Sequence, residues 1–237
     1  MILEVAGLTK SFDERPVLDG ISLQVEAGEF VVLIGPNGCG KTVFLKILSG
    51  LIPPSSGRLR LAGPTTMAFQ RSPLFPWMTV RENLLISLND PSFRGRAERE
   101  VAAWLEESNL SRWADFYPHQ ISGGMRQKVN VIRSLMSNPP LVLMDEPFAS
   151  LDYLERRRLQ TFVSRLQLAK KTSLVFVTHD IPEAIFLADR ILVMSGNGKI
   201  ETDLRCPLPR PREHETLPRE AAYPDLYEKL SKLLSGN

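Results

Sequence analysis

The stretch Phe30–Thr42 reads FVVLIGPNGCGKT, an unbroken apolar run followed by a glycine-rich loop, a lysine and a threonine. Five consecutive apolar residues are typical of a strand buried on both faces of a parallel sheet. Glycines allow backbone turns that other side chains block, so successive N–H groups of the loop can face one phosphate group. The loop also opens a helix, whose N-terminus favours anions. The stretch therefore predicts a phosphate-binding loop within an α/β fold.

Two side chains of this loop have chemistry of their own. Lys41 supplies a point charge for the β- and γ-phosphates, and the Thr42 hydroxyl can ligate Mg²⁺. The alternative is a glycine-rich turn between strand and helix that binds nothing. The strand before the loop and the helix after it favour phosphate binding. The predicted nucleotide-binding residues of the loop are Gly35, Pro36, Asn37, Gly38, Cys39, Gly40, Lys41 and Thr42.

Further apolar runs indicate more buried parallel strands. They are Leu141–Met144, Ser173–Val177 and Ile191–Met194. Helical periodicity lies between them, after Lys41, over Leu154–Leu168 and over Pro182–Ala188, where proline stands in the first turn. This alternation predicts a mostly parallel sheet flanked by helices. Together with the glycine-rich loop, it predicts the core of a phosphate-loop nucleoside triphosphatase (NTPase).

The opening segment follows a different pattern. Ile2–Leu8 and Ile21–Val25 alternate between apolar and polar residues, and we expect turns at Asp13–Pro16 and Asp19–Gly20. Alternation is typical of antiparallel strands with one solvated face. We therefore expect an antiparallel β subdomain at the N-terminus.

The chain reads as one domain, 1–237, with distinct parts. Between Val80 and Met136 no strand-like run occurs, so residues 80–136 are predicted to be an inserted helical subdomain. Residues 1–79 and 137–204 form the predicted catalytic core. Residues 205–237 form a tail, proline-rich and extended at first. A short helix over Leu226–Leu234 is expected to close it.

Two carboxylates follow the run Leu141–Met144. Asp145 is predicted at the carboxyl end of its strand, where α/β folds place their ligands, and can hold Mg²⁺ through water. Glu146 can polarise an attacking water as general base. The alternative is an ordinary polar strand end, and the phosphate loop favours the catalytic interpretation.

Three further residues each allow two interpretations. His179 follows the strand Ser173–Val177 and is either a cap or surface residue or a contact of the γ-phosphate. Gln70 also follows a predicted strand, and is either a plain loop residue or part of the site. Phe12 either stacks on an adenine or fills the core beneath the hairpin.

A second anion site is indicated at Ile121, where the chain reads ISGGMRQKV. Ser122, Gly123 and Gly124 stand directly before a helical pattern, so bare backbone amides and a hydroxyl are available there. The alternative is that Ser122 is simply an N-cap. Glycines are poor helix formers, which favours access to the backbone.

Composition narrows the classes of partner. The 237 residues carry a formal net charge of +2, so no strong field argues for a nucleic-acid partner. Glu4 interrupts the first apolar stretch, so we expect no signal peptide, and no apolar run approaches the ~20 residues that span a bilayer. Any membrane role is therefore expected to come through a partner.

The ordered set of motifs resembles the ATP-binding-cassette (ABC) ATPases over nearly the whole chain. The set comprises Phe12, GPNGCGKT, Gln70, ISGGM, LVLMDEP, SLD at Ser150–Asp152 and TH at Thr178–His179. Two substitutions depart from the common pattern: Cys39 replaces a serine, at a position that acts through its amide, and Met125 stands where many members have glutamine.

The resemblance implies ATP and Mg²⁺ as cofactors and assigns roles to single residues. Catalytic roles fall to Lys41, Gln70, Glu146 and His179. Nucleotide contacts add Phe12, Val17, Gln70 and Asp145 to the loop residues, and the metal ligands are Thr42, Gln70 and Asp145. Ser122, Gly123, Gly124 and Met125 form the signature that caps the nucleotide of a second copy. Ser150, Leu151 and Asp152 form the segment at the dimer interface.

The stretches LFPWMTVRENL, YPHQISGGM and LPRPR look like the nitrate, sulfonate and taurine import ATPases. This implies an ATP-dependent homodimer on transmembrane permease subunits, at the cytoplasmic face of the bacterial inner membrane. A periplasmic or lipid-anchored binding protein would deliver the solute. The loop Leu74–Trp77, expected to be exposed, would face the permease. The alternatives are a soluble cassette protein acting on ribosomes or DNA, and a non-hydrolysing regulatory module.

Overall fold

The computed structural model describes residues 1–69, 74–88 and 94–235 of the chain. A six-stranded sheet has the order β5-β6-β7-β3-β8-β9. Strands β5 to β8 in that order are parallel, and β9 is antiparallel to β8. The strands are β3 (Phe30–Ile34), β5 (Thr65–Ala68), β6 (Leu141–Asp145), β7 (Ser173–Thr178), β8 (Arg190–Met194) and β9 (Ile200–Arg205). The predicted parallel sheet is confirmed, and its central strand β3 is the one that leads into the glycine-rich loop.

A second sheet, with the order β2-β1-β4, is antiparallel throughout. Its strands are β1 (Leu3–Phe12), β2 (Arg15–Val25) and β4 (Ser56–Leu61). The turn expected at Asp19–Gly20 is wrong, because β2 runs through both residues. Gly20 takes a φ of 67° where the pairing of β1 and β2 shifts register, so the glycine serves a bulge within the strand instead of a turn.

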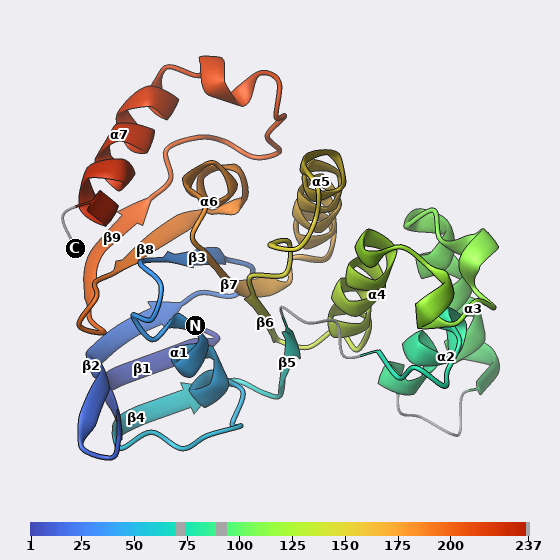
Figure 1. Ribbon diagram of the computed structural model, residues 1–237, viewed down its shortest axis with the longest axis horizontal. Helices are drawn as coiled ribbons and strands as arrows, with labels where there is room; N and C mark the ends of the chain where they lie inside the picture. Colours follow the sequence, from blue (N-terminus) through green and yellow to red (C-terminus); the bar gives the residue numbers. More distant parts are fainter. Residues whose placement is uncertain (70–73, 89–93, 236–237) are drawn as a thin grey trace.

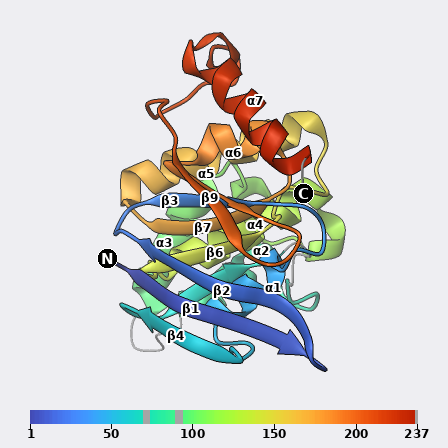
Figure 2. The same cartoon turned by 90° about the vertical axis from the view of Figure 1, so that its left-hand side faces the viewer.

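The larger sheet has one hydrophobic core on each face. In β3, Phe30, Val32 and Ile34 pack toward the helices, while Val31 and Leu33 pack toward the small sheet and α1 (Lys41–Leu48). All five side chains are buried, which explains why the run is unbroken. Figure 2 shows the small sheet on one side of the large one and the helices α5 and α6 on the other.

Residues 80–136 contain helices and no strand in the part of the chain that the structure describes. They are α2 (Val80–Leu85), α3 (Arg94–Glu107) and α4 (Gly123–Met136), with single turns at Ile86–Leu88, Ser111–Trp113 and Pro118–Gln120. Thr79 and Glu82 form a capping box that begins α2. Figure 1 shows α2 and α3 at the far end of the molecule from the C-terminal helix α7.

The loop before α2 is less exposed than expected. Leu74 is buried and Phe75 is half-buried, with its ring 5.5 Å from that of Trp77. Pro76 and Trp77 are exposed, Trp77 by 68%. The expectation that the whole stretch Leu74–Trp77 is exposed is therefore wrong, because its first two side chains pack against the helices of residues 80–136.

The helices that follow cover the second face of the large sheet. They are α5 (Tyr153–Lys170), α6 (Ile181–Leu187) and α7 (Ala222–Ser235), with a single turn at Leu217–Arg219 before α7. No helix among the described residues combines the length and the apolarity that a membrane crossing requires.

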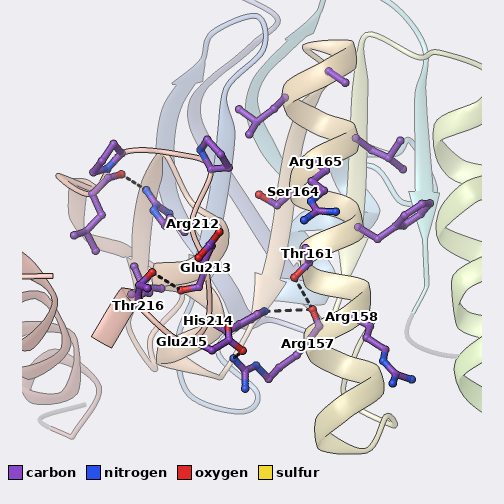
Figure 3. Close-up of a pocket in the computed structure, with 18 of the residues that line it drawn as sticks. Arg157, Arg158, Thr161, Ser164, Arg165, Arg212, Glu213, His214, Glu215 and Thr216 are labelled. Carbon is purple, nitrogen blue, oxygen red and sulfur yellow. Dashed lines mark hydrogen bonds and ion pairs between the residues drawn. The ribbon is translucent and has the colours of Figure 1, made fainter. Parts of the chain in front are cut away.

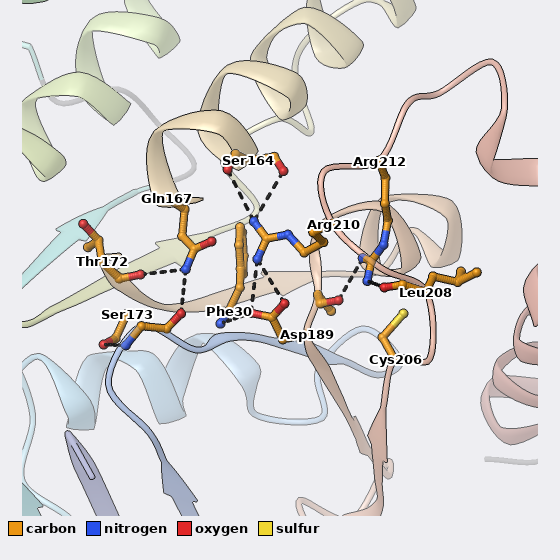
Figure 4. A network of polar contacts seen from close by, with 12 residues as sticks. Phe30, Ser164, Gln167, Thr172, Ser173, Asp189, Cys206, Leu208, Arg210 and Arg212 are labelled. Atoms are coloured by element: carbon orange, nitrogen blue, oxygen red, sulfur yellow. Dashed lines mark hydrogen bonds and ion pairs between the residues drawn. The ribbon is translucent and has the colours of Figure 1, made fainter. Parts of the chain in front are cut away.

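The tail beyond β9 is fixed to this layer by two arginines (Figure 4). Arg210 donates to the Asp189 carboxylate at 3.1 Å, and its guanidinium lies 5.1 Å from the ring centre of Phe30. Arg212 donates to the carbonyls of Ile185 at 2.6 Å and Ala188 at 2.8 Å. These carbonyls end α6, so the guanidinium serves as the C-terminal cap that the helix lacks within its own sequence.

Arg212→Met should lower the free energy of unfolding by about 3 kcal/mol, because the helix-end carbonyls lose a buried charged donor while the apolar stem is kept. Chemical denaturation monitored by circular dichroism measures the change. Arg205→Met, at an exposed position of β9, is the control and should leave the midpoint unchanged. Equal midpoints for the two variants would contradict the capping role.

Candidate nucleotide-binding and hydrolysis site

The glycine-rich loop encloses its own lysine. The Lys41 ammonium donates to the carbonyls of Gly35 and Pro36, both at 2.8 Å, and the side chain is buried. Cys39 is buried beside it, with its sulfur 3.9 Å from the ammonium, and burial raises the pKa of this thiol. The positive charge of Lys41, the first residue of α1, therefore lies against the backbone of the loop.

Two glycines are required by their neighbours. A Cβ on Gly40 would lie 2.6 Å from Leu18 and 2.9 Å from the Val17 carbonyl, and φ is 104°. A Cβ on Gly35 would lie 2.5 Å from the Met194 carbonyl. The loop is thus pressed between β2 and the end of β8, and Val17 lies directly against it.

The predicted metal ligands Thr42 and Asp145 meet across 103 positions of sequence. The Thr42 hydroxyl donates to Asp145 Oδ1 at 3.1 Å. Burial raises the pKa of Asp145, and this hydrogen bond opposes the rise. A hydroxyl and a carboxylate are oxygen donors of the kind Mg²⁺ prefers, with substrate phosphates and water completing its shell. The pair therefore fits a magnesium ion.

Glu146 and His179 also meet. Glu146 Oε2 lies 3.1 Å from His179 Nδ1, and their side chains are 18% and 58% exposed. Glu146 has a φ of 43°, uncommon for any residue other than glycine, and its N–H donates to the Val177 carbonyl at 3.0 Å. Strained backbone of this kind persists where the surroundings hold it, and it is frequent at functional sites. Here it accompanies the ion-pair geometry that brings the carboxylate to the histidine.

The environment of Glu183 was missed by the sequence analysis. This carboxyl is buried and accepts a hydrogen bond from Gln160 Nε2 at 2.7 Å. Burial raises its pKa to about 7. The spacing of Asp180 and Glu183 is a sequence signal for a helix cap with an exposed glutamate, so the pattern did not indicate a buried one.

The structure bears on the prediction for Phe12 but not on the one for Gln70. Phe12 is 45% exposed, so it does not fill a core beneath the hairpin. The Lys10 ammonium lies 4.9 Å from the centre of its ring. Gln70 lies outside the described residues, and its predicted role stays a prediction.

The signature residues begin α4. Ser122 is the N-cap and accepts from the Met125 amide at 3.2 Å, so it is a cap as expected. Gly123 is exposed, and Gly124 packs against Glu155 at the start of α5. Figure 1 shows α4 and α1 on opposite sides of β5 and β6. Within one chain, the signature therefore does not adjoin the glycine-rich loop.

The segment Ser150–Asp152 lies between β6 and α5. Ser150 and Asp152 are exposed, while Leu151 is buried. Asp152 caps α5 by accepting from the Glu155 amide at 3.0 Å. The segment therefore has an exposed surface and is fixed to the N-terminus of α5.

A large cavity lies elsewhere. It measures about 1360 Å³ and is lined by α5 and the tail, with Arg157, Thr161, Arg165 and His214 at its wall (Figure 3). His214 stacks on Phe186 with ring centres 3.7 Å apart. Of the predicted nucleotide-binding and catalytic residues that the structure describes, none lines this cavity.

Comparison with known proteins agrees with this geometry. Residues 18–149 match the family model described as ABC transporter. The aliphatic sulfonates import ATP-binding protein SsuB of Granulibacter bethesdensis is 40% identical over 95% of this chain and 91% of its own length. The SsuB protein of Bacillus cereus is also 40% identical, over 90% of this chain and 89% of its own length.

Solved structures show the same fold. The dimeric structure of MJ0796, a bacterial ABC transporter cassette, has a TM-score of 0.78 at 26% identity and covers 86% of this chain and 99% of its own. CbiO1 from Clostridium perfringens, part of the ABC transporter complex cbiONQ, has a TM-score of 0.80 at 20% identity. The match covers 97% of this chain and 98% of CbiO1. The family model and the SsuB relatives together show that this chain belongs to the ABC transporter family, as an ATP-hydrolysing, ATP-binding subunit of the importer type.

Proposed function

We propose that two copies of this chain hydrolyse ATP at two shared sites, head to tail, and thereby drive uptake of an aliphatic sulfonate or similar small anion. The observation that carries this proposal is the separation of the two phosphate-binding half-sites, on α1 and α4, within one chain (Figure 1). Neither half-site is complete alone, but a two-fold related pair completes both. The sulfonate is suggested by the SsuB relatives, and the MJ0796 cassette supplies a dimeric neighbour.

In this proposal the loop 35–42 binds the phosphates through its backbone amides and the Lys41 ammonium. Val17 and the exposed ring of Phe12 border the base, and Gln70 adds a contact near the γ-phosphate. Thr42 and Asp145 hold Mg²⁺, which would neutralise phosphate charge when bound. Residues 1–79 and 137–204 act as the catalytic core, and 80–136 as the helical unit that presents the signature.

Glu146 is the general base of this mechanism. Its carboxylate takes a proton from the attacking water, and the His179 ring, at 3.1 Å, keeps it oriented. Ser122, Gly123 and Gly124 of the second copy donate to the γ-phosphate from a helix N-terminus. Ser150–Asp152 faces the same interface. ATP drives closure because it binds the closed pair better than the open one.

The partner in the membrane is a permease. Pro76 and Trp77 expose an apolar surface next to α2, and a large exposed aromatic side chain of this kind is typical of a protein interface. We infer that the permease binds this surface, that the subunit is thereby held at the cytoplasmic face of the membrane, and that a separate binding protein delivers the solute.

Mixing two inactive variants tests whether the sites are shared. Lys41→Ala removes the charge in the loop, and Ser122→Arg blocks the signature. Each alone should lack turnover, since both sites of each homodimer are damaged. A mixed dimer contains one intact site, made of the loop of the Ser122→Arg copy and the signature of the Lys41→Ala copy. Phosphate release should therefore return on mixing.

The expected recovery is up to about a quarter of wild-type turnover, from statistical pairing with one of two sites intact in half of the dimers. A control mixes Lys41→Ala with a second loop variant, Thr42→Ala, and should give no recovery. Absence of recovery with the Ser122→Arg partner would show that the signature acts within its own chain.

A further inference from the structure

A small polar cavity adjoins Glu146, the proposed base, and His179, which contacts it. It has a volume of about 20 Å³, and its polar lining includes Glu146, Arg156, Thr178, His179, Asp180 and Glu183. One water needs roughly 10–15 Å³ and two to four polar partners. The cavity meets both conditions, and two of its walls are the proposed base and its histidine.

Arg156 provides an unmatched donor at this cavity. Its Nε is buried and has no hydrogen-bond partner among the described residues. The two terminal nitrogens are occupied, one by the Leu151 carbonyl at 3.4 Å and the other by Asp180 Oδ2 at 3.6 Å. A buried N–H without a partner costs free energy, so a water in the adjoining cavity is the acceptor that the geometry provides.

Glu183 borders the same cavity; its N–H is capped by Asp180, but its carboxyl takes no part in the cap. In a capping box its carboxylate would accept from the Asp180 amide, but that amide donates to the Thr178 hydroxyl at 3.0 Å. The Glu183 carboxyl instead faces inward, where Gln160 and the Thr178 hydroxyl donate to it. The charged groups around it are Asp180 and Arg156, with Glu146 and His179 across the cavity.

We propose that this cavity binds one water, which accepts from Arg156 Nε and links Glu183 to Glu146 and His179, so that Arg156 and Glu183 are positioning residues for hydrolysis. Arg156 also connects two segments: it contacts the carbonyl of Leu151, in the segment proposed to lie at the dimer interface, and Asp180, next to His179. This inference rests on the proposed role of Glu146 as the base. It adds a connection, through Arg156, between the proposed dimer-interface segment Ser150–Asp152 and the proposed base Glu146 of the same copy.

Two substitutions test the positioning role by steady-state ATP hydrolysis. Arg156→Lys keeps a positive charge for Asp180 but removes the Nε donor, and Glu183→Leu keeps the size of the side chain but removes its polar atoms. Each should lower kcat about 10-fold, as a small displacement of a reacting group does. The KM for ATP should change by less than about two-fold, since the loop that binds ATP is untouched.

Matched variants separate positioning from general damage. Glu183→Gln keeps the shape of the side chain and one acceptor oxygen, so it should lower kcat less than Glu183→Leu does. Arg158→Lys, at a side chain that is 72% exposed and pairs with Glu155 on the same helix, should retain wild-type kcat. Wild-type kcat in Arg156→Lys or Glu183→Leu would overturn the proposal, as would a Glu183→Gln variant as slow as Glu183→Leu.

A crystal structure that resolves waters tests the site directly. One water within hydrogen-bonding distance of Arg156 Nε is expected in the wild type, and a dry cavity there would overturn the proposal. Failure of the base assignment is distinguishable, because it would show as wild-type turnover in Glu146→Gln, whatever the Arg156 and Glu183 variants do.

Discussion

Glu146→Gln should lower the rate of ATP hydrolysis by roughly 10²- to 10⁴-fold, the usual contribution of a positioned general base. The amide has the shape of the carboxylate but cannot accept the proton of the attacking water. The glutamine side chain has the same length and can still reach His179, and the loop 35–42 is unchanged. ATP should therefore still bind, and the bound form should accumulate as a dimer that gel filtration resolves.

Phosphate release and gel filtration in the presence of ATP measure the two halves of this prediction. Glu106→Gln is the matched control, since it makes the same chemical change on an exposed face of α3. Wild-type turnover in Glu146→Gln would assign the base to another group. Loss of ATP binding together with turnover would show instead that Glu146 supports the loop.

Gly40→Ala should lower the free energy of unfolding by about 4 kcal/mol, the sum of backbone strain and overpacking. The added methyl group would lie 2.6 Å from Leu18 and 2.9 Å from the Val17 carbonyl, at a φ of 104°. Neither neighbour moves freely, because Leu18 is buried and the carbonyl is part of β2. The loop must open to relieve the contact, so ATP binding should fall as well.

Gly38→Ala separates the two causes. Gly38 also has a positive φ, 81°, but a Cβ there meets nothing within 4 Å. Its cost should be the strain alone, about 1–2 kcal/mol. Denaturant unfolding without nucleotide measures both variants, so that contact with phosphate does not enter the comparison. Equal losses for Gly38→Ala and Gly40→Ala would show that packing against Val17 and Leu18 is unimportant.

Much of the fold was predictable, because its signals are local. The unbroken run Phe30–Ile34 is a strand buried on both faces, and the alternation over Ile2–Leu8 belongs, from Leu3 on, to an antiparallel strand. Asp19–Gly20 was misjudged because a glycine with positive φ serves a bulge as well as a turn. Leu74 and Phe75 were misjudged because their burial depends on distant helices.

The site was predictable in its residue types but not in its contacts. The position of Lys41 within the loop follows from adjacent residues. The arrangement of Arg156, Thr178 and Glu183 beside Glu146 had no such signal, since Asp180 and Glu183 have the spacing of an ordinary helix cap. The sequence also contained no signal that Arg212 caps the C-terminus of α6, since the composition of the tail predicted only an extended chain.

The amino-acid sequence by itself determined four buried strands, β3, β6, β7 and β8, the helices α1, α5 and α6 between strands, the place of the glycine-rich loop, and which side chains carry charge. Those properties depend on neighbours within a few positions, whose sterics and periodicity fix the backbone. Only the tertiary structure decided that Thr42 meets Asp145, that Glu146 meets His179, and that α1 and α4 lie apart. These contacts depend on the strand order β5-β6-β7-β3-β8-β9, which is set by the packing of two cores against one sheet and by no single stretch of the chain.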